Sequence, residues 1–338
     1  MRAVGYQNPL SIDDPDALVD IDLPKPAPQG RDLLIEVKAV SVNPVDTKVR
    51  KNARPDEGQW KVLGWDAAGI VVETGPDAEL FSVGDAVFYA GALGRPGTNA
   101  EFHLVDERIV GEKPKSLDWA QSAALPLTAI TAWEALFDRL DVNKPVPGGA
   151  RSILIVGGAG GVGSIAIQLA RQLTDLTVIA TASRPETQDW ARDLGAHHVI
   201  DHSAGLSNGM AALGIGAPSY VFSTTHTDEH LPDIAELIAP QGRFALIDDP
   251  GTLAVNAFKQ KSVSTHWEFM FTRSMFETDD MEEQGALLND VARLIDDGTL
   301  RTTFGQHFGV INADNLKRAH ELLESHAAMG KIVLENFQ

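Results

Sequence analysis

The sequence contains no cysteine among its 338 residues. This absence excludes disulfide bonds, cysteine-ligated zinc, iron–sulfur clusters and a thiol nucleophile. Basic side chains are also scarce, because 28 Lys and Arg residues stand against 47 Asp and Glu residues and give a formal net charge of −19. Such a charge repels phosphate backbones and anionic membranes, and no basic cluster interrupts it. Neither nucleic acid nor a membrane is therefore an expected partner.

Targeting and membrane segments are missing as well. Residues 1–15 lack the apolar centre of a signal peptide and reach acidic residues by Asp13, which predicts a cytoplasmic protein. The uncharged stretch 152–170 is long enough to suggest a membrane span, but it contains five glycines and Gln168. A strand, a turn and a helix are expected there instead.

Hydrophobic periodicity separates two regions of the chain. The first region, up to residue 110, contains short β-like runs between turn residues, as in a small antiparallel barrel. From Leu125 onward, apolar strands alternate with helical segments, as a parallel sheet with crossover helices requires. Strands are expected at 152–156, 177–181, 198–200, 220–223, 243–247 and 262–271, and a helix is expected at 281–295.

The predicted fold class is therefore α/β, with a doubly wound Rossmann domain inserted into a barrel-like domain. The chain is longer than one hydrophobic core usually supports, and its 43% apolar residues suffice for two. The expected boundaries are 1–125 and 298–338 for the barrel-like domain and 126–297 for the Rossmann domain. The run 262–271, as the last strand of an open sheet, would leave an apolar edge for a second copy. A homodimer is therefore expected.

A glycine-rich segment has the spacing of a phosphate-binding loop. Gly158, Gly160 and Gly163 match the pattern G-x-G-x-x-G directly after the apolar run 152–156. The apolar residues from Val162 onward then recur on one face of a helix. Glycines permit the tight turn, and the helix N-terminus offers unpaired N–H groups to a pyrophosphate. The loop predicts a dinucleotide site.

The end of the second strand of this region indicates which dinucleotide fits. A carboxylate there binds the ribose 2′-OH, whereas a 2′-phosphate needs a cation. Counting twenty residues past Gly163 reaches Ser183, followed by Arg184, and no acidic residue stands there. These two residues predict NADP(H), and the alternative is that Arg184 merely points into water.

Six segments spread along nearly the whole chain carry a resemblance to a known family. They are 41–46, 64–69, 83–85, 123–128, 157–163 and 330–331. In these segments the chain resembles the medium-chain dehydrogenase/reductase superfamily and, within it, the zinc-independent quinone oxidoreductases and their zinc-type alcohol dehydrogenase-like branch. The resemblance implies a Rossmann domain inserted into a GroES-like β-barrel domain.

The same resemblance implies that no metal ion is bound. Zinc alcohol dehydrogenases of the superfamily have a Cys where this chain has residues 43–46, and a His-Glu pair where it has Trp65 and Asp66. The four-cysteine structural zinc lobe is also missing. The one cluster with metal-like spacing, His226-x-x-x-His230, lacks a third partner and is interpreted as part of a polar loop.

Further roles come from the resemblance alone. It implies that Thr128 lies beside the nicotinamide, that Lys331 contributes to the cofactor site and that Trp65 lines the substrate pocket. It also implies that Asn43 and Asp46 are the catalytic candidates, Asn43 as a hydrogen-bond donor and Asp46 as the residue that orients Asn43 or a water. An Asx-turn or a helix N-cap is an equally good interpretation of this pair. The predicted pyrophosphate contacts are Gly158, Gly160, Gly161, Val162 and Gly163.

Three functions remain open at this point. The first is an NADPH-dependent reductase of quinones or α,β-unsaturated carbonyls, with a small-molecule substrate and a proton taken from water or from the protein. The second is a zinc-type alcohol dehydrogenase, which the missing cysteines disfavour. The third is a non-catalytic NADPH-binding protein, because a fold alone does not prove an activity.

Overall fold

The computed structural model describes residues 1–337 and divides into two compact units. The first unit comprises residues 1–130 and the C-terminal part of the chain from Phe271, and the second comprises Thr131–Met270. Within residues 1–337, no helix is both long enough and apolar enough to cross a membrane.

The second unit is built on a six-stranded sheet whose neighbouring strands all run parallel. Its strands lie in the order β11-β10-β9-β12-β13-β14. From β9 the chain first adds strands on one side, β10 and β11, and then adds β12, β13 and β14 on the other side, as in a doubly wound sheet. The six strands confirm the predicted parallel sheet. Their bounds are β9 (Ala150–Val156), β10 (Thr177–Thr181), β11 (His198–Ile200), β12 (Pro218–Ser223), β13 (Arg243–Leu246) and β14 (Ser264–Trp267).

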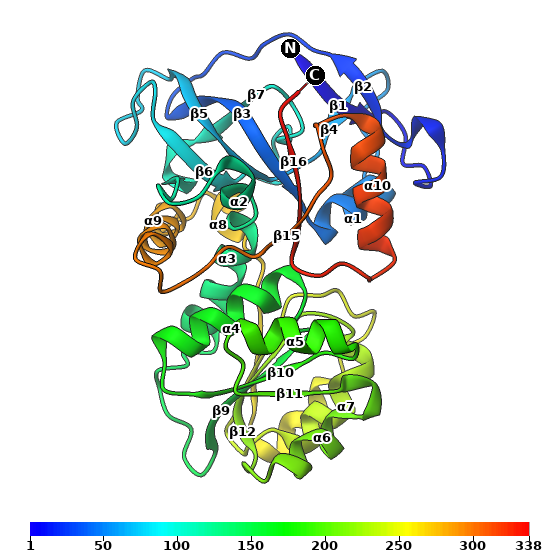
Figure 1. The fold of residues 1–338 in the computed structure, drawn as a ribbon, viewed down its shortest axis with the longest axis vertical. Helices are drawn as coiled ribbons and strands as arrows, with labels where there is room; N and C mark the ends of the chain where they lie inside the picture. Colours follow the sequence, from blue (N-terminus) through cyan, green and yellow to red (C-terminus); the bar gives the residue numbers. More distant parts are fainter. Residues whose placement is uncertain (338) are drawn as a thin grey trace. The chain divides into compact units, whose positions relative to one another are not determined.

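Helices cover both faces of this sheet. Figure 1 shows α4 (Gly161–Leu173) and α5 (Pro185–Asp193) on one face, and α6 (Leu206–Leu213) and α7 (Thr227–Leu237) on the other. The central strand β12 is buried at every position, and its middle residues Tyr220, Val221 and Phe222 are aromatic or aliphatic. Short 3-10 turns, η4 (His202–Ala204) and η5 (Val255–Lys261), complete the connections.

The first unit contains two further sheets. The larger has seven strands in the order β15-β16-β3-β5-β6-β8, with β7 also paired to β3. Its bounds are β3 (Asp32–Val42), β5 (Asp66–Thr74), β6 (Ala86–Ala90), β7 (Phe102–Asp106), β8 (Val110–Glu112), β15 (Phe304–His307) and β16 (Lys331–Glu335). The smaller, in the order β2-β1-β4, consists of β1 (Arg2–Tyr6), β2 (Val19–Asp22) and β4 (Lys61–Val62).

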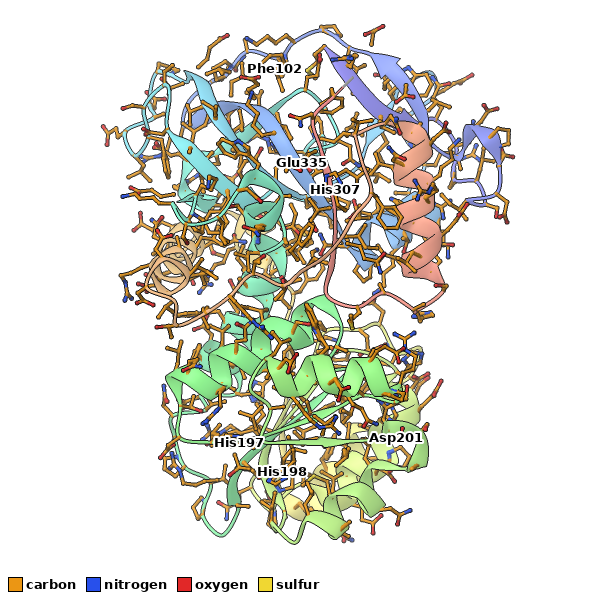
Figure 2. The ribbon with its side chains drawn as sticks, in the orientation of Figure 1. Phe102, His197, His198, Asp201, His307 and Glu335 are labelled. Carbon is orange, nitrogen blue, oxygen red and sulfur yellow. The ribbon has the colours of Figure 1, made fainter. Side chains whose placement is uncertain are left out.

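The C-terminal segment joins the larger sheet of the first unit. Strand β16 pairs antiparallel with β3, so that Ile332 lies opposite Val42. On its other side β16 pairs with β15, where His307 Nε2 and Glu335 Oε2 lie 3.0 Å apart (Figure 2). This pairing brings Lys331 next to residues near Val42, far away in the sequence.

Seven helices and turns of the first unit surround these sheets, together with α3, which begins in this unit. They are η1 (Pro15–Ala17), α1 (Pro44–Asn52), η2 (Glu107–Ile109), α2 (Trp119–Ala123), α8 (Thr272–Phe276), α9 (Glu283–Asp296) and α10 (Ala313–Glu324). Helix α3 (Pro126–Trp133) continues into a π-helical turn, η3 (Glu134–Arg139).

The compact units differ from the expected domain bounds at residues 126–130 and, more extensively, at residues 271–297. The longer segment was expected to belong to the Rossmann domain, but it groups with the first unit because α9 packs on β8 and η2. The approach is close enough that a Cβ on Gly111 would lie 2.6 Å from the Cβ of Leu288. Hydrophobic periodicity indicates that a helix has a buried face, but not which sheet that face covers.

Candidate active site

The predicted phosphate loop follows β9 and leads directly into α4. Helix α4 begins at Gly161 with Gly160 as its N-cap, so the first N–H groups of the helix have no partner within it. A Cβ on Gly163 would lie 2.3 Å from the carbonyl oxygen of Gly157, so only glycine allows the helix to pack this closely on the turn. Gly160, Gly161 and Val162 keep partial exposure, whereas Gly158 and Gly163 are buried.

The end of strand β10 holds this loop in place. Thr181 accepts hydrogen bonds on two atoms: its Oγ1 from the N–H of Gly157 at 3.0 Å and its carbonyl from the N–H of Gly158 at 2.9 Å. On the neighbouring strand, Thr224 Oγ1 donates to the carbonyl of Val156. The loop is therefore anchored by hydroxyl groups from the strands on both sides of β9, which preorganises it for a ligand.

Arg184 lies just beyond β10, as its spacing from the loop predicted. It is the N-cap residue of α5, and its Nε is 3.1 Å from Glu186 Oε1. The Arg184 side chain is 41% exposed, so this ion pair is a weak surface interaction. Ser183 is exposed beside it. Both residues are accessible to a ligand phosphate, and their role in cofactor choice stays a prediction.

A buried polar network lies in the first unit, where β3, β5 and β16 meet. The Lys331 ammonium donates to Asp66 Oδ2 at 2.9 Å, to the carbonyl of Val42 at 3.1 Å and to Asn43 Oδ1. Asp66 also accepts from Asn43 Nδ2 at 2.7 Å and, on Oδ1, from the N–H of Leu127 at 2.7 Å. Because Lys331 and Asp66 are 3% exposed or less, their opposite charges compensate each other away from water.

Asn43 takes part in this network through its side-chain amide and also caps a helix. Its Nδ2 donates to Asp66 and, at 3.3 Å, to the carbonyl of Ser41, so both amide hydrogens already have acceptors. It is also the N-cap residue of α1. The cap position that the sequence offered as an alternative is therefore found, and the side chain reaches from the cap into the network.

Asp46 stands three residues further on and is fully buried. Its Oδ2 accepts from the N–H of Asn43 at 2.8 Å, whereas its Oδ1 has no hydrogen-bond partner. Burial raises the pKa of Asp46 to about 7, although the N–H of Asn43 and the charge of Lys331 act in the opposite direction. Asp46 can therefore carry a proton near neutral pH.

Trp65 and Thr128 are the two remaining predicted residues of the first unit. Trp65 is 2% exposed and its ring meets that of Phe271 edge to face, with centroids 5.8 Å apart. Thr128 is buried in α3 and donates through Oγ1 to the carbonyl of Leu125 at 3.0 Å. The predicted place of Thr128 beside a nicotinamide stays a prediction.

Two family models match this chain. The model described as "Alcohol dehydrogenase GroES-like domain" covers residues 29–115, and the model described as "Zinc-binding dehydrogenase" covers residues 194–334. A zinc-type alcohol dehydrogenase-like protein of Staphylococcus aureus is 39% identical over 339 residues, which is 99% of each chain. The chain belongs to the medium-chain dehydrogenase/reductase superfamily. Within it, the chain falls in the quinone oxidoreductase-like branch.

Solved structures of superfamily members share the whole fold. A Rhizobium etli protein provisionally named as a zinc-dependent alcohol dehydrogenase is 68% identical, with a TM-score of 0.98 over 100% of this chain and 98% of that one. The quinone oxidoreductase of Coxiella burnetii is 26% identical, with a TM-score of 0.81 over 100% and 99% of the two chains. A mycobacterial protein solved with NADPH is also 26% identical, with a TM-score of 0.81 over 99% of both. The α/β fold with GroES-like and Rossmann parts is thus confirmed.

The residues at the superfamily's zinc-ligand positions do not fit a zinc ion. The indole of Trp65 offers a donor and no lone pair to a metal. Both oxygens of Asp66 are engaged, one of them by the ammonium of Lys331. Across residues 1–337, no group of three or more His, Cys, Asp or Glu side chains is arranged to hold a metal. His226, which the spacing of the sequence suggested as a possible metal ligand, is instead hydrogen-bonded through Nδ1 to Thr225 Oγ1 at 2.7 Å.

The histidine pair 197–198 belongs to the start of β11. His197 Nδ1 accepts from the N–H of Val178 at 2.9 Å, and Figure 2 labels both histidines with Asp201 at this edge of the sheet. Asp201 accepts from the N–H of Ser203 at 2.8 Å and so begins the turn η4. His197 is exposed and His198 is half-buried, so the pair lies at the protein surface and not in the core.

The structure brings the predicted site residues together in two groups. The first unit holds Asn43, Asp46, Trp65, Thr128 and Lys331, and the second holds Gly158, Gly160, Gly161, Val162, Gly163, Ser183 and Arg184. Lys331, expected at the cofactor, donates all of its N–H groups within the buried network.

Sequence reasoning missed Asp66 and Thr181 as members of the site. An acidic residue at the start of the apolar run 66–72 was a usable signal for Asp66, because a buried carboxylate needs a charged partner. For Thr181 the signal was its place at the end of the second strand.

Proposed function

We propose that this protein transfers a hydride from NADPH to a quinone or an α,β-unsaturated carbonyl compound without a metal ion. The observation that carries the proposal is the glycine loop that connects β9 to α4. Such a loop at the carboxyl end of a parallel strand suits the pyrophosphate of a dinucleotide. The mycobacterial structural relative was solved with NADPH, which supports a nicotinamide cofactor.

The proposal of NADPH rather than NADH depends on the end of β10. Arg184 provides a guanidinium there, and a guanidinium can bind a phosphate with two parallel hydrogen bonds. Ser183 adds a hydroxyl group next to it. An acidic residue that would bind a ribose 2′-OH is missing from the segment 181–184.

The proposed reaction needs no Lewis acid because the acceptor is conjugated. NADPH bound at this loop would supply the hydride, with its two electrons, and would leave as NADP⁺. A C–H bond would form at the electron-poor carbon of the acceptor, whose π electrons would move toward its oxygen. The resulting enolate would take a proton from water or from a protein group, and a quinone adduct would then tautomerise to the hydroquinone. A hydrogen-bond donor stabilises this spread charge, whereas a saturated ketone builds its charge on one oxygen.

Asn43 and Asp46 remain our candidates near the reacting groups, with roles refined by the geometry. Asn43 has no spare amide hydrogen, so we propose that it positions Asp66, Lys331 and the start of α1 rather than binding substrate itself. Asp46 has an open oxygen and a pKa of about 7, so we propose it as the protein group that exchanges a proton.

The proposal is tested by following NADPH absorbance with three acceptors supplied separately. We expect the quinone menadione and the enone cyclohexenone to be reduced, and the saturated ketone cyclohexanone to react far more slowly. Equal rates with cyclohexanone would contradict the mechanism. NADPH binding without turnover of any acceptor would indicate a non-catalytic NADPH-binding protein instead.

A further inference from the structure

The indole N–H of Trp65 is a hydrogen-bond donor with no acceptor. The Nε1 atom is buried, and it has no hydrogen-bond partner. Trp190 shows the usual alternative, because its Nε1 donates to Ser164 Oγ at 2.8 Å. Across residues 1–337, Trp65 is the one tryptophan whose buried N–H lacks a partner.

An unpaired buried donor is costly and therefore calls for an explanation. A buried donor without an acceptor has lost its hydrogen bonds to water and gained none in return, so proteins rarely keep one unless it has a use. The backbone carbonyl of Trp65 accepts from the N–H of Gly91 at 3.0 Å, which holds the residue in place just before β5. The one polar atom of the Trp65 side chain has no such partner.

We propose that the N–H of Trp65 binds the oxygen of the acceptor during hydride transfer. This inference rests on the proposed function and names the donor that the function requires. Asn43, the donor expected from the sequence, has both amide hydrogens engaged, whereas Trp65 has its hydrogen available. A donor that is held in place and shielded from water is the arrangement that best stabilises a developing oxyanion.

Access to this donor depends on Phe271. The ring of Phe271 covers the indole edge to face, at 5.8 Å between centroids, and Phe271 is the first residue after the chain returns from the second unit. A planar quinone or enone ring can replace such an aromatic contact, because it offers a face of similar size. The acceptor oxygen would then meet the N–H while its ring packs on the indole.

The competing explanation is that the N–H points at the face of the Phe271 ring. Such an N–H···π contact is a weak hydrogen bond and would serve the fold alone. The two explanations differ in what Trp65→Phe does to turnover. Phe lacks the N–H and is smaller than Trp, so the change removes the donor together with some packing volume in either case. If the N–H serves the fold alone, the kcat of the folded protein stays unchanged, whereas kcat falls if the N–H binds the acceptor oxygen.

The first experiment compares Trp65→Phe with the wild type in urea unfolding, NADPH binding and turnover. We expect a lower stability from the smaller side chain, an unchanged Kd for NADPH and a fall in kcat of about 10- to 100-fold with menadione and cyclohexenone. Trp119→Phe is the matched control, since Trp119 lies on α2 with the ammonium of Lys113 over its ring, and it should leave kcat unchanged. An unchanged kcat in Trp65→Phe would overturn the proposal.

The second experiment separates this inference from the proposed function. The protein has 6 tryptophans, so 15N-tryptophan labelling gives a small set of indole signals, and Trp65→Phe assigns one of them. With NADP⁺ bound, cyclohexenone should shift the Trp65 indole proton downfield even though no hydride is available. A shift without turnover would contradict the proposed function and leave the binding role standing. Turnover without a shift would overturn the binding role alone.

Discussion

Arg184 is the residue on which the choice of cofactor depends. A charge-assisted hydrogen bond contributes about 1.5–3 kcal/mol. The change Arg184→Ala should therefore weaken NADPH binding roughly tenfold to a hundredfold and leave NADH binding little changed. Titration of both cofactors by fluorescence measures the two Kd values. Equal losses for NADPH and NADH would show that Arg184 acts elsewhere.

Glu186 provides the matched variant for that experiment. Its carboxylate holds Arg184 at 3.1 Å and must give way to a 2′-phosphate. Glu186→Gln removes this competition and the repulsion between carboxylate and phosphate, so NADPH should bind slightly more tightly. NADPH binding should therefore weaken in Arg184→Ala and strengthen in Glu186→Gln. These opposite changes distinguish a guanidinium that binds phosphate from one that only stabilises α5.

At the scale of elements, runs of β-branched and apolar residues predicted where the parallel strands lie. The predicted bounds of β10 and β11 agree with the structure, whereas β12 begins two residues earlier than predicted. The predicted strand 262–271 is shorter in the structure, since β14 ends at Trp267. Glu268 then turns inward to Arg139, and Phe271 leads into α8.

The residues of the candidate site also differ in whether the sequence alone could predict them. The glycine loop and Arg184 follow from local spacing, so the sequence predicted both. The Lys331–Asp66 contact joins residues 265 positions apart and depends on β16 pairing with β3. A single sequence contains no periodicity that reports such a pairing, so the resemblance alone suggested a role for Lys331.

The π-helical turn η3 and the end of β14 are joined by a buried pair of carboxyl groups. Glu134 begins η3, Glu268 follows β14, and both are 2% exposed or less. Glu268 also accepts from Arg139 Nε at 2.9 Å. Burial and the neighbouring Glu134 raise the pKa of Glu268 to about 9, against the pull of Arg139. The buried pair Glu134–Glu268 therefore holds a proton at neutral pH.

This raised pKa makes stability depend on pH with a definite sign. The unfolded chain loses the Glu268 proton near pH 4.5, whereas the folded chain keeps it until about pH 9. The free energy of unfolding should therefore fall between these values, by at most about 1.4 kcal/mol per pH unit for this group. Glu268→Gln keeps a side chain of the same shape that can form hydrogen bonds, but its amide group does not titrate.

The measurement is urea unfolding of wild type and Glu268→Gln across that pH range. The variant should gain stability relative to wild type as the pH rises. Glu57→Gln, a change at an exposed carboxylate, is the control and should leave the slope unchanged. If the free energies of unfolding of Glu268→Gln and wild type differed by the same amount at every pH, the raised pKa would be contradicted.

At the scale of the whole molecule, the open edge of the parallel sheet is the main feature left to explain. Strand β14 is the last of the six strands, and Trp267 and Phe269 are 54% and 46% exposed. Such an edge offers unpaired N–H and C=O groups next to apolar side chains, and a second copy can cover both. A homodimer stays our prediction on this basis.

Light scattering during size-exclusion chromatography tests the homodimer. The wild type should elute as a dimer at micromolar concentration, and Trp267→Lys should shift it toward monomer, because a charge on an edge strand opposes pairing. Trp60→Lys adds the same charge at another exposed tryptophan and should have no effect. A wild type that elutes as a monomer would contradict the predicted homodimer.

The central claim is that this superfamily member reduces conjugated acceptors with NADPH and without a metal. The most direct measurement is the turnover of menadione and cyclohexenone by protein dialysed against a strong chelator, with the metal content determined on the same sample. We expect full activity with no stoichiometric metal, because Asp66 is engaged by Lys331 and Trp65 cannot ligate. One bound zinc per chain, whose removal abolishes turnover and whose return restores it, would contradict the account.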